Sequence, residues 1–453
     1  MILFNKIFEF VTKGHPRSVK AKKNVLISFG IKGISILVQL LYIPLLVNYL
    51  GTTDYGLFLT LSSIVGWFSF FNLGLTFGLK NHFAEALAVN DQEKAGKLVS
   101  TTYIVLSVVF AVVMSLSLLV FPFVNVEKLF NIKLDSSDLY ILMIITFFSF
   151  CIRMILQVIF AVLEADQRPA EVSFVNMLSS VLSLISVFII TRLKSYGDLL
   201  LTGSIINIVP LIVMSLYTVI LFSGRYKNYR PSLKKLDFSY SKGLFNLGGK
   251  FFIIQIADMI LFSTTNFIII QYFSAKDVTI YNIGYRYFSI ISMLFGIIIA
   301  PLWSATTEAF IKEDFVWIRN TFRKIRFIGL VFVFCAFCML MVSEPVIRIW
   351  VGEKVLIPFS LKLVFFVNVS TGVLFTPYVA FLNGVSKIKL NLYLTVLNTC
   401  TFFPYILLFI KGIGLGVAGV VLGSFFAELP CRISQPIQYY KLVNKTAKGI
   451  WNA

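Results

Sequence analysis

Long apolar segments alternate with short polar ones along the whole chain. Twelve of the apolar segments are long enough to cross the roughly 30 Å hydrocarbon core of a bilayer. A helix satisfies its own backbone hydrogen bonds, as a lipid environment requires. The pattern therefore predicts an all-α polytopic membrane protein with about 12 transmembrane helices. We expect them at residues 25–49, 57–79, 101–125, 139–163, 174–193, 199–223, 245–273, 280–304, 326–346, 358–383, 390–410 and 414–436.

The predicted spans form two sets of six, separated by a polar and basic linker. This arrangement predicts two six-helix bundles that insert with the same polarity, as parallel repeats. The expected divisions are a basic N-terminus at 1–24, an N-terminal bundle at 25–223, a cytoplasmic linker at 224–244, a C-terminal bundle at 245–436 and a basic tail at 437–453.

A weak internal repeat relates the two halves. Residues 47–91 resemble the stretch that begins 223 positions later, with no gap in the register. The hydropathy around the two copies also agrees, which favours two like halves. The identical pairs are Tyr49 and Tyr272, Asp54 and Asp277, Glu85 and Glu308, Ala86 and Ala309, and Asp91 and Asp314.

Composition and charge agree with a membrane protein. The chain is 58% hydrophobic and 13% charged, whereas soluble domains contain about 25% charged residues. A formal charge of +19 would suggest a nucleic-acid partner in a soluble protein. Here the Lys and Arg residues cluster in the segments on one side of the predicted spans. The positive-inside rule then predicts that both termini are cytoplasmic and that nucleic acid is not a partner.

Polar residues follow one face of the first predicted span and one face of the seventh. Spacings of three and four residues place Ser28, Lys32, Ser35 and Gln39 on a single helical face. Gln255 and Asp258 of the seventh span correspond to Lys32 and Ser35 at the same offset of 223. The two stripes predict a water-filled cavity between the halves, and the alternative is hydrogen bonding in a dry helix interface.

Other charged residues inside spans are candidates for the same cavity, because an intramembrane charge normally faces a partner or water. Arg153 lies near the middle of the fourth span and Arg286 in the eighth, where snorkelling or pairing with Asp277 is the alternative. Lys362 is expected to snorkel toward the surface. Asn72 and Lys80 are also expected to line the cavity. Glu428 and Arg432 are four residues apart and are expected to neutralise each other as a structural pair.

Patterns typical of catalysis or metal binding are missing from the sequence. No phosphate-binding glycine loop, metal-ligand cluster or Ser/His/Asp set is present. Cys335 and Cys338 have the spacing of a redox pair, but without acidic or His partners they are expected to be small apolar residues of a buried helix. The sequence thus predicts neither a metal site, nor a cofactor, nor an enzyme.

Two polar segments and one glycine series predict further local structure. Residues 81–100 and 305–326 have the pattern of amphipathic helices near the inner membrane surface. Gly412, Gly416, Gly419 and Gly423 have the spacing of close helix packing, and a glycine turn leading into a helix is the alternative.

The stretch from Asn48 to Ala88 resembles the N-terminal signature of bacterial polysaccharide flippases. The most specific similarities are Leu50-Gly51, Tyr55-Gly56-Leu57 and Asn72-Leu73-Gly74 before residues 81–85. These proteins translocate O-antigen or capsule repeat units. They share a superfamily with multidrug and toxin extrusion transporters. The similarity is strongest over residues 25–110 and then becomes similarity of hydropathy.

The resemblance implies a V-shaped transporter fold with alternating access in the bacterial inner membrane. The implied cargo is an undecaprenyl-pyrophosphate-linked oligosaccharide, with membrane lipid, a polysaccharide polymerase and a chain-length regulator as partners. A cationic cavity would hold the pyrophosphate through Lys32, Lys80, Arg153 and Arg286. Asp258 would then bind a coupling H⁺ or Na⁺ or pair with a lysine.

Two other functions are weighed against this one. A cation-coupled multidrug antiporter of the same fold would depend on Asp258 and not on the basic residues. A membrane-embedded glycan polymerase or glycosyltransferase would need a large external loop or a cytosolic catalytic domain, and the chain has neither.

Overall fold

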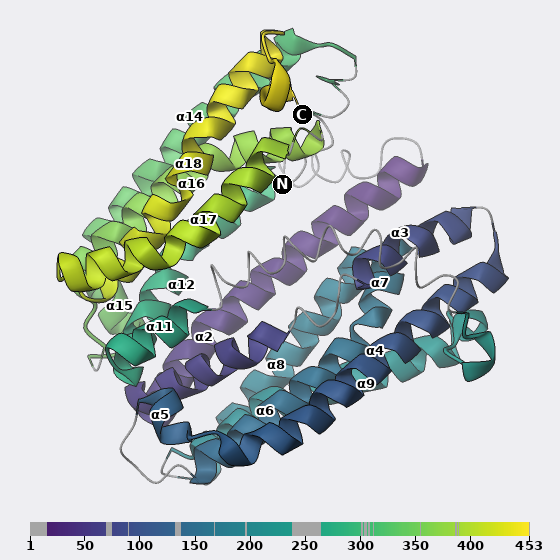
Figure 1. Ribbon diagram of the computed structural model, residues 1–453, viewed down its shortest axis with the longest axis vertical. Coiled ribbons are helices and arrows are strands. Elements are labelled where there is room, and N and C mark those ends of the chain that lie inside the picture. The colour runs from purple at the N-terminus through teal and green to yellow at the C-terminus, as the bar shows by residue number, and fades with distance from the viewer. Residues whose placement is uncertain are drawn as a thin grey trace, which may run out of the picture. The chain divides into compact units, whose positions relative to one another are not determined.

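The structure is a computed structural model in which all regular secondary structure of the described residues is helical (Figure 1). Residues described are 16–68, 75–88, 90–131, 137–166, 168–194, 197–237, 264–299, 302, 306, 309–310, 312–353, 355–385, 387 and 389–452.

Nine helical stretches in the described parts are long and apolar enough to cross a membrane. They match nine of the twelve predicted spans, which confirms an all-α polytopic membrane protein. The other three predicted spans, 57–79, 245–273 and 280–304, each extend partly into residues that are not described. A count of about 12 therefore stays a prediction.

Contacts divide the chain into two compact units. Unit 1 comprises residues 1–51 and 61–256, and unit 2 comprises residues 52–60 and 257–453. Residues 52–60 thus belong to unit 2, although they lie within the sequence range expected for the N-terminal bundle. The long helix that contains them is interrupted at Gly51, whose φ of 82° only glycine adopts readily.

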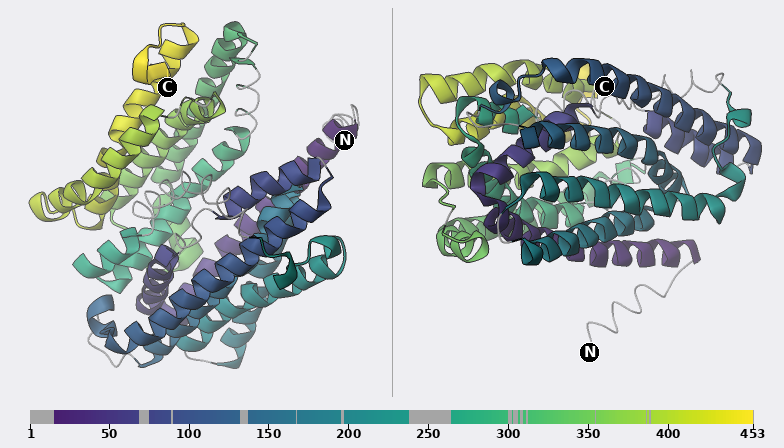
Figure 2. Two further views of the ribbon diagram at one scale, coloured as in Figure 1. Left: turned by 45° about the vertical axis from the view of Figure 1, so that its right-hand side comes forward. Right: turned by 90° about the horizontal axis from the view of Figure 1, so that it is seen from below.

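Unit 1 contains a set of helices that run side by side in Figures 1 and 2. Helix α9 packs against both α6 and α8, while α3 packs against α4 and α7. Their bounds are α2 (Pro16–Gly66, of which residues 52–60 belong to unit 2), α3 (Leu75–Ala88), α4 (Gln92–Val120), α5 (Val126–Phe130), α6 (Ser137–Leu156), α7 (Val158–Ala165), α8 (Pro169–Leu193) and α9 (Leu199–Ser223).

Unit 2 repeats this packing scheme. Helix α18 packs against α16 and α17, and α16 also packs against α12 and α14. Rings of Phe322, Tyr378, Phe381 and Tyr439 form an aromatic core there. The bounds are α11 (Thr264–Tyr272), α12 (Ala275–Ile299), α14 (Phe315–Met341), α15 (Ser343–Val351), α16 (Phe359–Gly384), α17 (Lys389–Leu407) and α18 (Val417–Val443).

The turns that precede α4 and α14 have the same backbone hydrogen bonds, displaced by 223 positions. The N–H of Asp91 donates to the carbonyl of Ala86 at 2.9 Å, and the N–H of Asp314 donates to the carbonyl of Ala309 at 2.9 Å. The preceding residue has a positive φ in both turns, 56° at position 90 and 55° at position 313. The internal repeat found in the sequence is therefore also a repeat of local structure.

These turns show that the two predicted amphipathic helices are wrong as continuous helices. Residues 81–100 are split where α3 ends and Asp91 caps α4, and residues 305–326 contain a turn before Asp314 caps α14. The physical reason is the cap itself. Each aspartate side chain accepts a hydrogen bond at 2.9 Å from a backbone N–H in the first turn of its helix, which sets the start of that helix.

Replacing either Asp91 or Asp314 with Ala is expected to lower the free energy of unfolding by about 1 kcal/mol, because one N-terminal N–H loses its acceptor. Thermal unfolding of the purified protein in one detergent would measure the loss. Asn is an equally good N-cap, so Asp→Asn at either position should leave stability nearly unchanged. Equal losses for Asn and Ala would mean that the charge, and not the cap, stabilises these helices.

The glycine series near the end of the chain contributes both to a turn and to close helix packing, the two alternatives predicted from its spacing. Gly416 has a φ of 58° and precedes α18, so it belongs to a turn. At Gly423, an added Cβ would lie 2.8 Å from the backbone nitrogen of Ile406 in α17. The second part of the series therefore permits close packing of α17 and α18.

Candidate functional site

The polar stripe of the first span lies on α2, and the structure describes part of it. Ser35 donates its hydroxyl to the carbonyl of Ile31 at 2.9 Å, and Gln39 is exposed. Ser28 and Lys32 lie in α2, but their side chains lie outside what the structure describes. Three further predicted residues, Asn72, Gln255 and Asp258, also lie outside the described residues.

Lys80 is neutralised by a carboxylate that the sequence did not indicate. It lies on α3, and its ammonium contacts Glu164 of α7 at 2.8 Å, with both side chains about two-fifths exposed. The helices that bear the two residues pack together in unit 1. Sequence reasoning missed this pair because Glu164 is 84 positions away, beyond any helical spacing.

Arg153 is exposed on α6, in the middle of a membrane-spanning stretch. Within the described residues its guanidinium has neither an ion pair nor a hydrogen bond to a carboxylate. An intramembrane charge without a counterion is costly, by about 2.5–3.5 kcal/mol on insertion scales. Within the described part of the chain, no carboxylate therefore competes with an anion for the N–H donors of the guanidinium.

Arg286 is half-buried on α12 in unit 2. The predicted alternative, pairing with Asp277, is wrong for the described residues, because that carboxylate instead accepts the hydroxyl of Ser274 at 2.6 Å. Like Arg153, Arg286 has no carboxylate partner in the described part of the chain.

Arg432 forms the most connected ion pair inside a span. Its guanidinium contacts Glu428 at 2.6 Å, as the spacing of four residues predicts. It also donates to the side-chain oxygen of Asn368 at 2.5 Å and to the hydroxyl of Thr371, both on α16. The structural role expected for this pair is thus supported by a network that joins α18 to α16. The spacing of three between Asn368 and Thr371 was the signal that sequence reasoning did not use.

Lys362 does not snorkel, contrary to the prediction. Its side chain is only 6% exposed, and its ammonium contacts Glu344 at 2.6 Å. Burial becomes possible because α15 brings that carboxylate over the start of α16, where Lys362 lies. The prediction failed because the carboxylate is 18 positions away.

The cysteines are free, and two of them differ from expectation. Cys335 and Cys338 are exposed on α14, so the prediction of a buried helix is wrong at these positions. Among the described residues, no group of three or more His, Cys, Asp or Glu side chains could hold a metal ion.

A sequence profile of the polysaccharide biosynthesis protein family matches residues 21–305, which is more than half of the chain. The chain belongs to this family. Two curated relatives have names that refer to the export or transport of O-antigen. A Yersinia pseudotuberculosis protein named for O-antigen export is 24% identical over 80% of this chain and 83% of its own length. A Salmonella typhi protein named for O-antigen transport is 23% identical over 61% of this chain and 62% of its own length.

Solved structures with the same fold are multidrug transporters. An inward-facing multidrug resistance MATE family transporter of the MOP superfamily has a TM-score of 0.71 at 16% identity, and the match covers 93% of this chain and 100% of that one. An outward-facing one has a TM-score of 0.61 at 15% identity, covering 93% and 96%. At this identity the likeness shows the fold, which is the transporter fold expected from the sequence.

Proposed function

We propose that this chain is a flippase that translocates a lipid-linked oligosaccharide across a membrane, for the synthesis of surface polysaccharide. The family match, and the two relatives named for O-antigen export and transport, support a transporter and not an enzyme. For such cargo the lipid tail can stay in the bilayer, while the sugars and the charged linkage need a polar path.

One observation favours a diphosphate-linked cargo. Of the four described basic residues within spans that are discussed above, Lys362 and Arg432 have carboxylate partners, whereas Arg153 and Arg286 have none. A diphosphate would supply the missing negative charge, and guanidinium groups match phosphate oxygens in geometry. We infer that each of these two arginines contacts the diphosphate of the cargo at some stage of transport.

Finer features of the proposal follow the family resemblance. The lipid would be undecaprenyl pyrophosphate and the membrane the bacterial inner membrane, with both termini in the cytoplasm. A polysaccharide polymerase and a chain-length regulator would use the translocated product. Lys32 and Lys80 would contribute to the same path, with Lys80 released from Glu164 or acting together with it. The predicted water-filled cavity and the coupling H⁺ or Na⁺ at Asp258 remain part of this proposal.

The antiporter alternative rests on the fold shared with multidrug transporters. A pair of variants separates the two functions. In the flippase, Lys32→Ala is expected to reduce transport of a diphosphate-linked oligosaccharide by about tenfold, because a charged hydrogen bond contributes roughly 1.5–3 kcal/mol. In an antiporter, Asp258→Asn would abolish cation-coupled drug efflux, and Lys32→Ala would have little effect.

Both variants can be measured in proteoliposomes, with leaflet exchange of the oligosaccharide lipid and efflux of a cationic dye as parallel assays. Dye efflux that needs Asp258, together with no exchange of the oligosaccharide lipid, would replace the flippase by the antiporter.

A further inference from the structure

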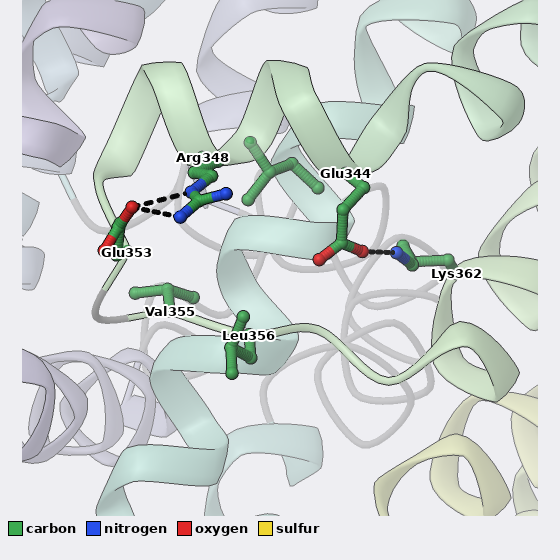
Figure 3. A pocket seen from close by; sticks show the side chains of 7 residues that line it. Glu344, Arg348, Glu353, Val355, Leu356 and Lys362 are labelled. Atoms are coloured by element: carbon green, nitrogen blue, oxygen red, sulfur yellow. Dashed lines mark hydrogen bonds and ion pairs between the residues drawn. The ribbon is translucent and has the colours of Figure 1, made fainter.

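A pocket of about 290 Å³ opens in unit 2 beside α15, the short helix between α14 and α16 (Figure 3). We call it the α15 pocket. Its charged lining consists of two ion pairs. Glu344 contacts Lys362 at 2.6 Å, and Arg348 donates to Glu353 at 2.9 Å. Figure 3 shows Val355 and Leu356, from the extended segment before α16, next to these pairs.

The α15 pocket has equal numbers of positive and negative side chains, but the ammonium of Lys362 has few hydrogen-bond partners. Lys362 is 6% exposed, and among the described residues its ammonium has Glu344 as its one hydrogen-bond partner. An ammonium has three N–H donors, so two of them remain for something in the pocket. The hydrogen bond and charge of Lys362 hold the pKa of Glu344 below its usual value, so this carboxylate, ionised at neutral pH as glutamates ordinarily are, stays ionised at more acidic pH as well.

Exposed apolar side chains lie on the segment that leads from the α15 pocket into α16. Leu356, which lines the pocket, is 69% exposed, and Phe359, three residues further on, is 60% exposed. The pocket lies between the end of one membrane-spanning helix and the start of the next, and hence at a membrane–water boundary. A ligand there can place a polar group against the ion pairs and hydrocarbon against these side chains.

From this combination we infer that the α15 pocket binds the headgroup of a zwitterionic phospholipid that bears a primary ammonium, of the phosphatidylethanolamine class. The phosphate of the lipid lies against Arg348 and Lys362, and its ammonium lies against Glu344 and Glu353. The acyl chains extend over Leu356 and Phe359.

The balance of charge favours a zwitterion over an anionic lipid. Each cation of the pocket already faces a carboxylate, so a purely anionic headgroup would meet repulsion from Glu344 and Glu353 along with attraction from the cations. A zwitterion has a negative phosphate for the two cations of the lining and a positive ammonium for the two carboxylates. Its charges are therefore complementary to those of both ion pairs.

The other half of the chain provides a natural comparison. In unit 1 a pocket of about 540 Å³ lies at the corresponding place, beside α5 between α4 and α6. Its charged lining residue is Glu127, and the remaining lining, from Val124 to Ile141, is uncharged. The fold thus produces a pocket in both units, but the described lining has basic residues only in unit 2. We expect the unit 1 pocket to lack the lipid preference.

Native mass spectrometry of the purified full-length protein tests this inference. The protein is titrated with palmitoyl-oleoyl phosphatidylethanolamine, and separately with phosphatidylglycerol of the same acyl chains. The main variant is Arg348→Gln with Glu353→Gln, which removes both charges of the more exposed pair. Glu344→Gln is a second variant, and Glu127→Gln in the unit 1 pocket is the matched control.

We expect the unchanged protein to bind phosphatidylethanolamine more tightly than phosphatidylglycerol. Either α15-pocket variant should bind phosphatidylethanolamine about tenfold more weakly than the unchanged protein does. The Glu127→Gln variant should bind it as tightly as the unchanged protein. Equal binding by the unchanged protein and both variants would overturn the inference. Equal or tighter binding of phosphatidylglycerol would make the pocket an anion site instead. Displacement of the lipid by glycerophosphoethanolamine at similar concentrations would show that the free headgroup, and not a lipid, is the ligand.

Discussion

Replacing both Arg153 and Arg286 with Gln is expected to slow leaflet exchange of a diphosphate-linked oligosaccharide lipid about a hundredfold. A charged hydrogen bond contributes roughly 1.5–3 kcal/mol, and about 1.4 kcal/mol is a factor of ten. Each substitution alone should therefore cost about tenfold. Neither guanidinium has a carboxylate partner in the described part of the chain. Each substitution therefore removes a positive charge without leaving a carboxylate unpaired, and the effect on transport should be large.

Two variants serve as matched controls for the loss of positive charge. Lys276→Gln changes an exposed residue at the start of the same helix as Arg286, and Arg192→Gln changes an exposed residue at the end of α8. Both should exchange the lipid at the normal rate. Normal exchange by the double variant, with the protein reconstituted to the same density, would remove the two arginines from the transport path.

Replacing Gly56 with Ala is expected to destabilise unit 2 by about 3 kcal/mol, at the upper end of the usual cost of overpacking. A Cβ at position 56 would lie 1.8 Å from the carbonyl oxygen of Ala275, which cannot move without shifting the start of α12. The same contact includes a hydrogen bond of 2.6 Å from the hydroxyl of Thr279 to the carbonyl of Thr52. Thermal unfolding in detergent would measure the loss.

The control for this prediction lies in the same helix. A Cβ at Gly66 would meet no atom within 4 Å, so Gly66→Ala should be neutral or slightly stabilising, because Ala is a better helix former by up to about 1 kcal/mol. An equal loss of stability at both positions would mean that helix backbone entropy, and not the approach of α12, determines the effect.

The internal repeat explains why this contact is built as it is. Positions 56 and 279 are equivalent at the offset of 223, and so are positions 52 and 275. Thr279 donates its hydroxyl to the carbonyl of Thr52. The equivalent hydrogen bond would run from residue 56 to the carbonyl of Ala275, but residue 56 is glycine and has no side chain to make it. Glycine at one of the two equivalent positions therefore brings the two backbones together where two threonine-sized side chains could not fit.

Features that depend on nearby residues could be predicted from the sequence. The membrane spans follow from hydropathy, and the pair of Glu428 and Arg432 follows from a spacing of four along one helix. The repeat at 223 positions correctly related Asp91 to Asp314. Their role as helix caps was missed and became visible only in the structure, where each aspartate side chain accepts an N–H from the first turn of its helix.

Features that depend on contacts between distant helices could not be predicted. The carboxylates that neutralise Lys80 and Lys362 lie on other helices, at separations that no periodicity connects. Burial of Lys362 also depends on α15, whose position is set by tertiary packing. For the same reason, hydropathy alone did not separate the neutralised cations from Arg153 and Arg286, and this separation is the basis of the proposed diphosphate contact.

The most direct test of the account compares two cargo lipids in liposomes that contain the unchanged protein. One is a polyprenyl lipid joined to an oligosaccharide through a diphosphate, and the other has the same oligosaccharide and lipid joined through an uncharged linkage. Accessibility of the sugar to an impermeant reagent reports exchange between leaflets. The account predicts rapid exchange of the diphosphate-linked lipid and at least tenfold slower exchange of the uncharged one. Equal rates for the two lipids, or no exchange of either above protein-free liposomes, would contradict it.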